Sequence, residues 1–412
     1  MSQQAPVLCI SNGDSAWSAA LAAIGTFPLI DSSWDDALDG IERVNPAAVL
    51  ATDCDVAGER FAAAARRVAQ IAPYVPLIAI NADASQHAPN AISFSSGDGH
   101  LGRLEGRLNA ALRVRTLHAT VLRRLADDAT TIEIPNTDPL NDATVLLIGR
   151  GASYPRLSIA LGERMGVVGA LSIEAAAKHL NARDLDGIVI GEGFSHRVID
   201  AFLTVLSEDP RFRNLPVTLT GQAAAFVSAP NLPNLEIAAG PAEEVAAGAV
   251  PLIRQHAFEA GLIRALNALD AGGLLDARTG LLTATAFDRN FGKTIDETLD
   301  RGGGLSVARF AFDVAQERVR FDAARILSRL MRRMDFASLQ DDGSVLVAFA
   351  ETDLRTAHII TRRLASVLRH TLHGEGRDKR VDPQVTLVTL RAKDSKETLR
   401  ERLYGECQRA AS

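Results

Sequence analysis

The sequence has little of what marks secreted, membrane-spanning or metal-cluster proteins. Its three cysteines, Cys9, Cys54 and Cys407, lie far apart and outside any CxxC or Cys/His spacing. This pattern favours a reducing compartment and argues against a bound metal. No apolar run reaches the roughly 18 residues that a membrane span needs, and the first residues do not resemble a signal peptide. We therefore expect a cytoplasmic protein with no membrane span and no metal.

An excess of positive charge is also missing. The chain carries 44 Lys and Arg against 50 Asp and Glu, a formal net charge of −6. A chain of this charge has no bulk attraction to nucleic acid or to an anionic membrane, so neither is expected as a partner. Any anionic ligand must be met by a local arginine cluster, and such clusters occur only late in the chain.

What is present is the composition of an ordinary globular protein. The 412 residues are 47% hydrophobic and 23% charged, and this length predicts two to four domains with ample core. We expect the chain to fold without a partner.

Residues 1–129 show alternating strand and helix patterns. Strands are expected at Val7–Ser11, Phe27–Ile30, Ala48–Ala51, Leu77–Ile80 and Ala91–Phe94, and helices at Trp17–Ile24, Asp35–Val44, Glu59–Gln70 and Leu101–Leu125. This alternation is typical of an α/β fold with a doubly wound, flavodoxin-like parallel sheet. The order of elements, with Pro46 leading into the third strand, resembles a response-regulator receiver domain.

The chemistry of a receiver domain is largely missing from this segment. Active receivers need acidic residues for Mg²⁺, a phosphoacceptor Asp after the third strand, a Ser or Thr after the fourth and a Lys after the fifth. Here Ser11-Asn12-Gly13-Asp14 follows the first strand, Thr52 or Asp53 falls at the acceptor position, and Ala82 and Ser95-Ser96 stand near the last two. Asp53 is either a weak phosphoacceptor or an inert residue that caps the next loop. We interpret the domain as unphosphorylated in practice.

The helix expected at Leu101–Leu125 carries a long leucine-rich stripe. A stripe of this length is compatible with a dimer seam. It is equally compatible with packing on its own domain and the next one, so a homodimer stays open.

A polar, proline-broken linker is expected at residues 130–142, and a second receiver-like domain at residues 143–260. Its strands are expected at Val145–Ile148, Val167–Ala170, Ile188–Ile190, Val217–Leu219 and Leu235–Ala238, and its helices at Leu157–Arg164, Ser172–Leu180, Val198–Ser207 and Ala242–Phe258. The alternation again predicts a doubly wound sheet.

The second domain has lost more of the receiver chemistry than the first. Gly191 falls at the phosphoacceptor position, Gly149-Arg150-Gly151 replaces the acidic cluster, and Gly240-Pro241 replaces the Lys-Pro pair. A switch hydroxyl can remain at Thr218 or Thr220. Glu192, beside the acceptor position, either imitates a permanent phosphoryl charge or reflects simple loss of chemistry.

The last third of the chain centres on a turn between a basic helix and an apolar strand. Apolar residues recur at helical spacing from Arg325 to Met334, and Asp341-Asp342-Gly343 then predicts a hairpin turn before the strand Ser344–Phe349. Further upstream, Asp276–Leu282 follows a helical segment at Ile253–Leu269. These features resemble GGDEF domains, which open with DxxTGL and in active members make cyclic di-GMP from two GTP. The resemblance covers residues 261–412 and implies an α+β, nucleotidyl-cyclase-like fold.

The resemblance can be set in register on both sides of the turn. Arg332-Arg333-Met334-Asp335 lies where the family carries its RxxD inhibitory-site motif, six positions ahead of the signature. Downstream, Thr352-Asp353-Leu354 and Ala357 match a run that opens the next helix. The five signature positions then read DDGSV, residues Asp341 to Val345.

In this register the residues for synthesis are missing. Active members hold two divalent metals with carboxylates at a strand end and in the signature hairpin. Ala311 stands at the strand-end metal position, Ser344 at the signature carboxylate and Gly343 at the acid before it, although Asp313 survives. Asp341-Asp342 occupies the two glycine positions, where a side chain would obstruct the nucleotide. The resemblance thus implies a degenerate cyclase that is not an enzyme and holds no metal.

The resemblance also implies that an inhibitory-type cyclic di-GMP site remains. Arg332 and Asp335 are three residues apart, and Arg363 falls where family members carry a second inhibitory-site arginine; Arg333 and Arg362 lie beside them. Arginine can bind guanine O6/N7 or phosphate bidentately, and Asp can accept from the guanine N–H edge. The alternative is that these arginines form a solvated helix face.

Two receiver-like domains before a degenerate GGDEF domain resemble the PopA-like family of cyclic di-GMP effectors, paralogues of the diguanylate cyclase PleD. The resemblance implies an adaptor that goes to a cell pole and works with a proteolytic adaptor of the RcdA type in cell-cycle control by ClpXP-dependent proteolysis. Two other functions stay open. One is a scaffold that needs no nucleotide, and the other is a diguanylate cyclase with an unusual signature.

Overall fold

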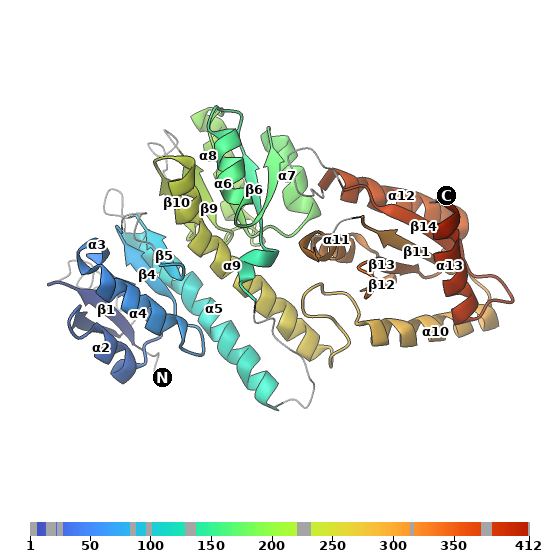
Figure 1. Ribbon diagram of the computed structural model, residues 1–412, viewed down its shortest axis with the longest axis horizontal. Helices are drawn as coiled ribbons and strands as arrows, with labels where there is room; N and C mark the ends of the chain where they lie inside the picture. The colour runs from blue at the N-terminus through green and yellow to red at the C-terminus, as the bar shows by residue number, and fades with distance from the viewer. Residues whose placement is uncertain are drawn as a thin grey trace. The chain divides into compact units, whose positions relative to one another are not determined.

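The computed structural model describes residues 6–13, 22, 28–82, 88–95, 101–127, 137–220, 232–313, 317–371 and 381–410 (Figure 1). Most of the chain up to Leu262 forms one compact unit, and the chain from Ile263 onward forms a second. The first unit holds two parallel sheets and the second an antiparallel one. The predicted helix Trp17–Ile24 lies almost wholly outside the described residues. None of the described helices is long and apolar enough to cross a membrane.

The first sheet is five-stranded and parallel, in the order β2-β1-β3-β4-β5. Its elements are β1 (Val7–Ser11), β2 (Leu29–Ser33), α2 (Ala37–Val44), β3 (Ala48–Ala51), α3 (Cys54–Ala57), α4 (Glu59–Ala69), β4 (Leu77–Ile80), β5 (Ala91–Phe94) and α5 (Leu101–Asp127). Because successive strand residues face opposite sides, Leu8 packs with α2 and α4, whereas Val7 packs with α5. We call this sheet with its helices the first lobe.

The second lobe repeats the same strand order, β10-β9-β8-β6-β7, again all parallel. Its elements are η2 (Pro139–Asp142), β6 (Thr144–Ile148), α6 (Tyr154–Gly162), β7 (Gly166–Ala170), α7 (Ile173–Ala182), β8 (Gly187–Ile190), α8 (His196–Glu208), β9 (Val217–Thr220), β10 (Leu235–Ala238) and α9 (Ala242–Asp270). The α/β class and the parallel sheets predicted from the sequence are therefore present in both lobes. Whether the lobes are receiver domains stays a prediction.

Some predicted boundaries were wrong. The second strand begins at Leu29, after Pro28, and the short helix α3 was not expected. The two helical segments predicted around Phe258 form one helix, α9, which continues through Pro251. The end of the predicted linker is ordered, because Asp138 caps η2, Leu140 is buried, and Arg254 pairs with Asp138 at 3.0 Å.

Arg107 of α5 joins the two lobes at their edge strands. Its guanidinium donates to the Ser93 carbonyl on β5 and, across the lobe boundary, to the Leu235 carbonyl at 2.7 Å and to Glu236 Oε2 at 2.6 Å on β10. Only 1% of the Arg107 side chain and 4% of the Glu236 side chain are exposed. Since β5 and β10 are edge strands, these contacts satisfy groups that would otherwise be open to other chains.

The helix α9 of the second lobe also packs on the first lobe. Leu252 lies in the same buried cluster as Leu104 and Leu108 of α5, and the Phe258 ring contacts those of Tyr74 and His118. Leu104 and Leu108 of the α5 stripe are therefore buried within this unit. This arrangement matches the packing alternative for the stripe and leaves these leucines unavailable as a dimer seam.

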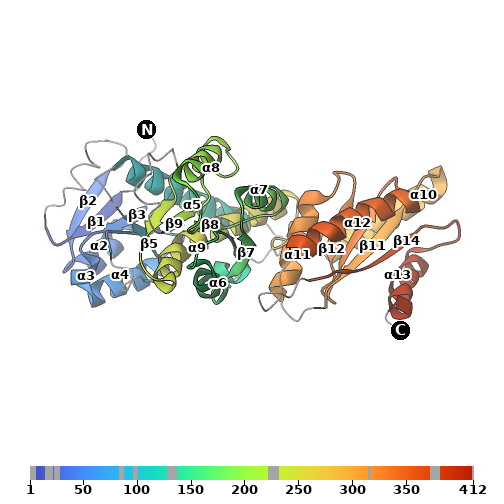
Figure 2. The same cartoon turned by 90° about the horizontal axis from the view of Figure 1, so that it is seen from above.

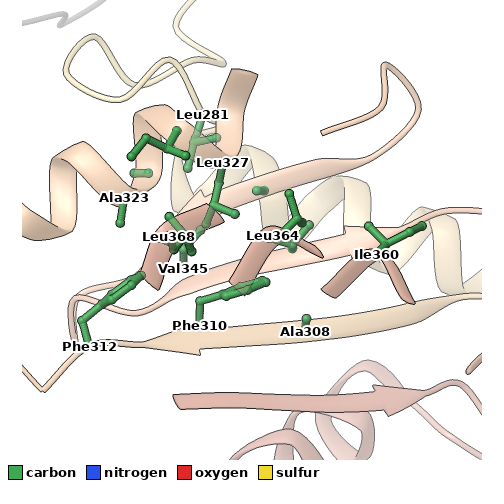
Figure 3. Packing of buried hydrophobic residues seen from close by; sticks show 14 of the residues in the cluster. Leu281, Ala308, Phe310, Phe312, Ala323, Leu327, Val345, Ile360, Leu364 and Leu368 are labelled. Carbon is green, nitrogen blue, oxygen red and sulfur yellow. The ribbon is translucent and has the colours of Figure 1, made fainter. Parts of the chain in front are cut away.

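The second unit is built on a four-stranded antiparallel sheet, in the order β12-β13-β11-β14. Its elements are α10 (Ala284–Arg301), β11 (Ser306–Ala311), α11 (Glu317–Leu330), β12 (Phe336–Leu339), β13 (Val345–Phe349), α12 (Leu354–Thr371), β14 (Gln384–Thr389) and α13 (Lys396–Ala410). Helices α11 and α12 cover one face, where Leu327 and Leu364 pack over Phe310 and Val345 (Figure 3). Helices α10 and α13 cover the other face.

The helix α11 differs from the predicted one at both ends. It ends at Leu330, so Met334 is 58% exposed and does not extend the apolar stripe. Arg325, predicted to project away from the core, is buried because its Nε donates to the Arg278 carbonyl at 2.8 Å.

The contacts between the lobes predict that two arginines of α5 contribute very differently to the free energy of unfolding. Arg107→Ala should lower the free energy of unfolding by about 3–5 kcal/mol, because it leaves the Glu236 charge buried and unpaired. Arg113→Ala, which removes a 45% exposed partner of Glu259, should cost about 0–1 kcal/mol. Urea unfolding followed by tryptophan fluorescence, to which the buried Trp34 contributes, measures both. If the two variants lost the same free energy of unfolding, the prediction that Arg107 forms a buried junction would be contradicted.

The surroundings of His118 predict that the free energy of unfolding of the same unit depends on pH. Burial and the nearby Arg115 charge lower the pKa of His118, whose Nδ1 accepts a hydrogen bond from the Tyr74 N–H at 3.0 Å. The folded state then binds fewer protons than the unfolded one, so the free energy of unfolding should fall as pH drops below about 6.5. His118→Asn keeps an acceptor without titrating and should reduce this fall. If the free energy of unfolding fell equally with pH in the wild type and in His118→Asn, His118 would not be the group responsible.

Candidate functional site

The RxxD segment forms a turn between α11 and β12, not the end of a helix. The Asp335 N–H donates to the Arg332 carbonyl at 3.0 Å, and the Arg332 N–H donates back to Asp335 Oδ2 at 3.3 Å. The turn exposes the side chains of Arg332 and Arg333 and buries that of Asp335, which is 8% exposed. The local conformation differs from the predicted helix because α11 stops at Leu330, and the role of these residues as a ligand site stays a prediction.

The carboxylate of Asp335 faces inward in this turn. Burial raises its pKa, against the opposing effects of the Arg332 N–H, the Arg332 charge and the nearby Ala350 N–H. Its Oδ1 is buried without a hydrogen bond in the part of the chain that the structure describes. The turn thus holds one acceptor atom that a donor group could still use.

The other predicted arginines lie on α12, which packs on the same face of the sheet as α11. Arg362 and Arg363 are both exposed, and no hydrogen bond or ion pair joins their side chains to another described residue. Adjacent helical residues project about 100° apart, so the two arginines point in different directions. Figure 2 shows α12 lying over β11 and β12 of the sheet.

The segment Asp276–Leu282 forms a closed turn at the entrance to the second unit. Asp276 Oδ1 accepts from the Thr279 N–H at 2.8 Å and from its hydroxyl at 2.6 Å, and the Asp276 N–H donates to the Leu281 carbonyl at 2.8 Å. The Arg278 guanidinium lies 3.5 Å from the centre of the Phe321 ring on α11. These contacts hold the entrance of the unit in place.

An arginine that the sequence analysis missed organises the signature hairpin. Arg309 on β11 donates from Nη2 to Asp342 Oδ2 at 2.8 Å and from Nε to the Ser344 hydroxyl at 3.1 Å. That hydroxyl donates to Asp342 Oδ1 at 2.6 Å, and the Arg309 guanidinium stacks over the Tyr404 ring. Partial burial alone would raise the pKa of Asp342, but the hydrogen bonds from Ser344 and Arg309 lower it. A single arginine within the apolar strand Ser306–Ala311 was the available signal.

The signature turn is also crowded from a second side. Gly343 has a φ of 77°, and a Cβ placed on it would lie 2.6 Å from the Arg320 side chain. Ala311 ends β11 and Asp313 is exposed beyond it. Within the described ranges, no group of three or more His, Cys, Asp or Glu side chains could hold a metal ion.

The acceptor positions in the two lobes differ in chemistry. Asp53 follows β3 with a φ of 54°, and its exposed carboxylate accepts from the Asn12 N–H at 3.3 Å and the Thr52 hydroxyl at 3.2 Å. Its side chain makes no capping bond to α3. In the second lobe Gly191 is buried beside the exposed Glu192. Asp14 and Ser96 lie outside the described residues.

No protein-family model matches the chain, and no curated protein matches it. Solved structures are similar over about a third of the chain. The coiled coil and GGDEF domain of DgcB from Caulobacter crescentus, in complex with c-di-GMP, is 13% identical with a TM-score of 0.32, covering 35% of this chain and 84% of that one. The diguanylate cyclase SiaD from Pseudomonas aeruginosa, in complex with its activator SiaC, is 18% identical with a TM-score of 0.32, covering 36% and 63%. The FimX GGDEF domain from the same organism is 14% identical with a TM-score of 0.30, covering 34% and 93%. At these TM-scores we draw no argument from the likeness.

The hairpin predicts an energetic coupling between Arg309 and Asp342. In a double-mutant cycle with Arg309→Ala and Asp342→Ala, the coupling energy at pH 7 should be about 0.5–1 kcal/mol, because the Asp342 side chain is 42% exposed. Asp341→Ala, at the adjacent exposed carboxylate, is the matched control and should not couple to Arg309→Ala. Chemical denaturation measures both cycles. Equal coupling at Asp341 and Asp342 would contradict the described pairing.

Proposed function

We propose that the protein is a non-catalytic receptor for cyclic di-GMP, with the ligand held by Arg332, Asp335 and Arg363. The observation that carries the proposal is the turn after α11. It exposes Arg332 and holds a buried carboxylate oxygen of Asp335 without a hydrogen bond in the described residues. The resemblance to GGDEF domains assigns these positions, with Arg363, to the inhibitory site.

The chemistry of these groups suits a guanine nucleotide. The exposed Arg332 and Arg363 guanidiniums can each bond bidentately to guanine O6/N7 or to phosphate. Asp335 accepts the guanine N1–H and N2–H once the turn relaxes enough to uncover its carboxylate. Arg333 and Arg362 add positive charge on either side, which a doubly anionic ligand needs in a protein with a net charge of −6.

The signature hairpin supports the non-catalytic part of the proposal. Catalysis by the resembled family needs carboxylates free to hold two metals. In this chain the Asp342 carboxylate is bonded to Arg309 and Ser344, and Ala311 has no carboxylate to offer. A guanidinium in place of a metal stabilises the fold of the hairpin and offers no open coordination position.

The resemblance to PopA-like proteins extends the proposal to a cellular role. In this role the protein is an adaptor or localisation scaffold in cell-cycle control, which works at a cell pole with an RcdA-type adaptor in ClpXP-dependent proteolysis. The two lobes would act as receiver domains without phosphotransfer, since the second has Gly191 at the acceptor position. A homodimer remains part of this wider proposal.

One observation favours a second function, a scaffold that needs no nucleotide. Asp335 already uses one carboxylate oxygen to close its own turn, bonding the Arg332 N–H at 3.3 Å. A residue with this structural role would be retained without any ligand. A diguanylate cyclase with an unusual signature is disfavoured by Ala311 and Ser344.

Calorimetric titration of the full chain with cyclic di-GMP tests the proposal. We expect binding by the wild type, and Arg332→Ala and Arg363→Ala should each weaken it about tenfold to a hundredfold, the value of one bidentate arginine contact. Arg369→Ala is the matched control, because Arg369 lies on the same helix but pairs with Asp382 at 2.8 Å. It should bind like the wild type.

Incubation with GTP and Mg²⁺ completes the experiment, and no cyclic di-GMP should form. Product formation would overturn the non-catalytic assignment. No binding by a folded wild type would overturn the receptor and leave the scaffold.

A further inference from the structure

The outward face of α12 is basic and partly apolar. Residues Leu354–Thr371 include no Asp or Glu, and Arg355, His358, Ile359 and Arg362 recur at the spacing of one helix face. Ile359 is 65% exposed and Leu354 is 45% exposed. We call Leu354, Arg355, His358, Ile359 and Arg362 the basic face. The chain as a whole has a net charge of −6, so this face is a positively charged region on a negatively charged protein.

The last two turns of α10 carry the complementary combination. Asp296, Glu297 and Asp300 are exposed there, and Leu299 beside them is 41% exposed. We call these four residues the acidic end. The exposed Arg289 and Lys293 lie further toward the N-terminus of the helix, and the exposed Arg301 ends it, so the three carboxylates outnumber the one cation in its last two turns.

The two surfaces lie on opposite sides of one sheet. The buried side of α12 packs with Ala308 and Phe310, and that of α10 packs with Val307 and Leu346. Successive residues of a strand face opposite sides, so the helices cover opposite faces, as Figure 1 also shows. The basic face and the acidic end therefore cannot meet within one molecule.

Both surfaces carry charges that the helices themselves disfavour. A helix stabilises negative charge at its N-terminus and positive charge at its C-terminus, by about 0.3–1 kcal/mol for each charge. Arg355 stands in the first turn of α12, and Asp300 stands in the last turn of α10. The dipole of each helix therefore does not favour these two charges.

We propose that the basic face of one molecule binds the acidic end of a second copy of this chain, in a head-to-tail contact. The two surfaces match in charge, and each offers an exposed aliphatic side chain, Ile359 or Leu299, to the contact. The chain as a whole has a net charge of −6 and so no bulk attraction to nucleic acid, which makes nucleic acid a poorer occupant. Because such a contact does not close on itself as a twofold dimer does, it can add further copies.

The contact should be weak and salt-sensitive. Each surface is small, so we expect dissociation constants on the order of 0.1 mM. Exposed charges are screened by salt, so the association should decrease as ionic strength rises. This inference is independent of the cyclic di-GMP site, although Arg362 borders both.

Charge reversal on each face provides the test, with the full chain in sedimentation experiments at low salt. The basic-face variant is Arg355→Glu with His358→Glu, and the acidic-end variant is Asp296→Arg with Asp300→Arg. Both pairs of substitutions agree with the helix dipoles, so they should not destabilise their helices. The wild type should show an average mass that rises with concentration, and each variant alone should lose at least about tenfold in association.

The equimolar mixture of the two variants is the decisive sample. In the mixture an acidic α12 face meets a basic α10 end, and the unchanged faces also complement each other, so association should return to the wild-type level. A wild type that stays monomeric to about 1 mM would overturn the proposal. So would variants that associate like the wild type, or a mixture that stays monomeric.

Discussion

The buried ion pair between Arg107 and Glu236 makes the two parallel sheets into one unit. Two charges removed from water are tolerated only when they satisfy each other and their remaining hydrogen bonds. Arg107 meets this condition by also donating to carbonyls on both edge strands. The pair therefore joins α5 to β10, and Leu104 and Leu108 of α5 pack beside it with Leu252 of α9.

Arginine has three different roles along this chain. In the first unit it is buried and connects two sheets. In the hairpin between β12 and β13, the Arg309 guanidinium bonds both Asp342 and Ser344 and holds the turn in place. On the turn after α11 and on α12, Arg332, Arg333, Arg362 and Arg363 are exposed and make no ion pair with another described residue, unlike Arg369, which pairs with Asp382. This last group is available to an anion, and the proposed ligand site uses it.

Much of the fold could be predicted because its strands are short aliphatic runs between turn residues. Ala48–Ala51 and Leu77–Ile80 agree with the sequence-based expectation at both ends. The start of β2 was misplaced because Pro28 precedes it, and α9 was predicted as two overlapping segments, Ala242–Phe258 and Ile253–Leu269, although it is one helix. The Arg107–Glu236 pair joins residues 129 positions apart, so no local pattern could reveal it.

For the candidate site, the sequence could assign residues but not their conformation. The register to the GGDEF signature placed Arg332, Asp335 and Arg363 together on one domain. It could not show that α11 ends at Leu330, which exposes Met334 and turns the Asp335 carboxylate inward. Helix ends are weakly encoded when charged and apolar residues continue past them, as they do here.

Hydrogen–deuterium exchange of the full chain, with and without saturating cyclic di-GMP, tests the central claim most directly. The account predicts slower exchange of the backbone amides in the turn from Arg332 to Asp335 and on the α12 segment around Arg363, with the signature hairpin unchanged. Unchanged exchange at that turn, or protection only at the Asp341–Ser344 hairpin, would contradict it.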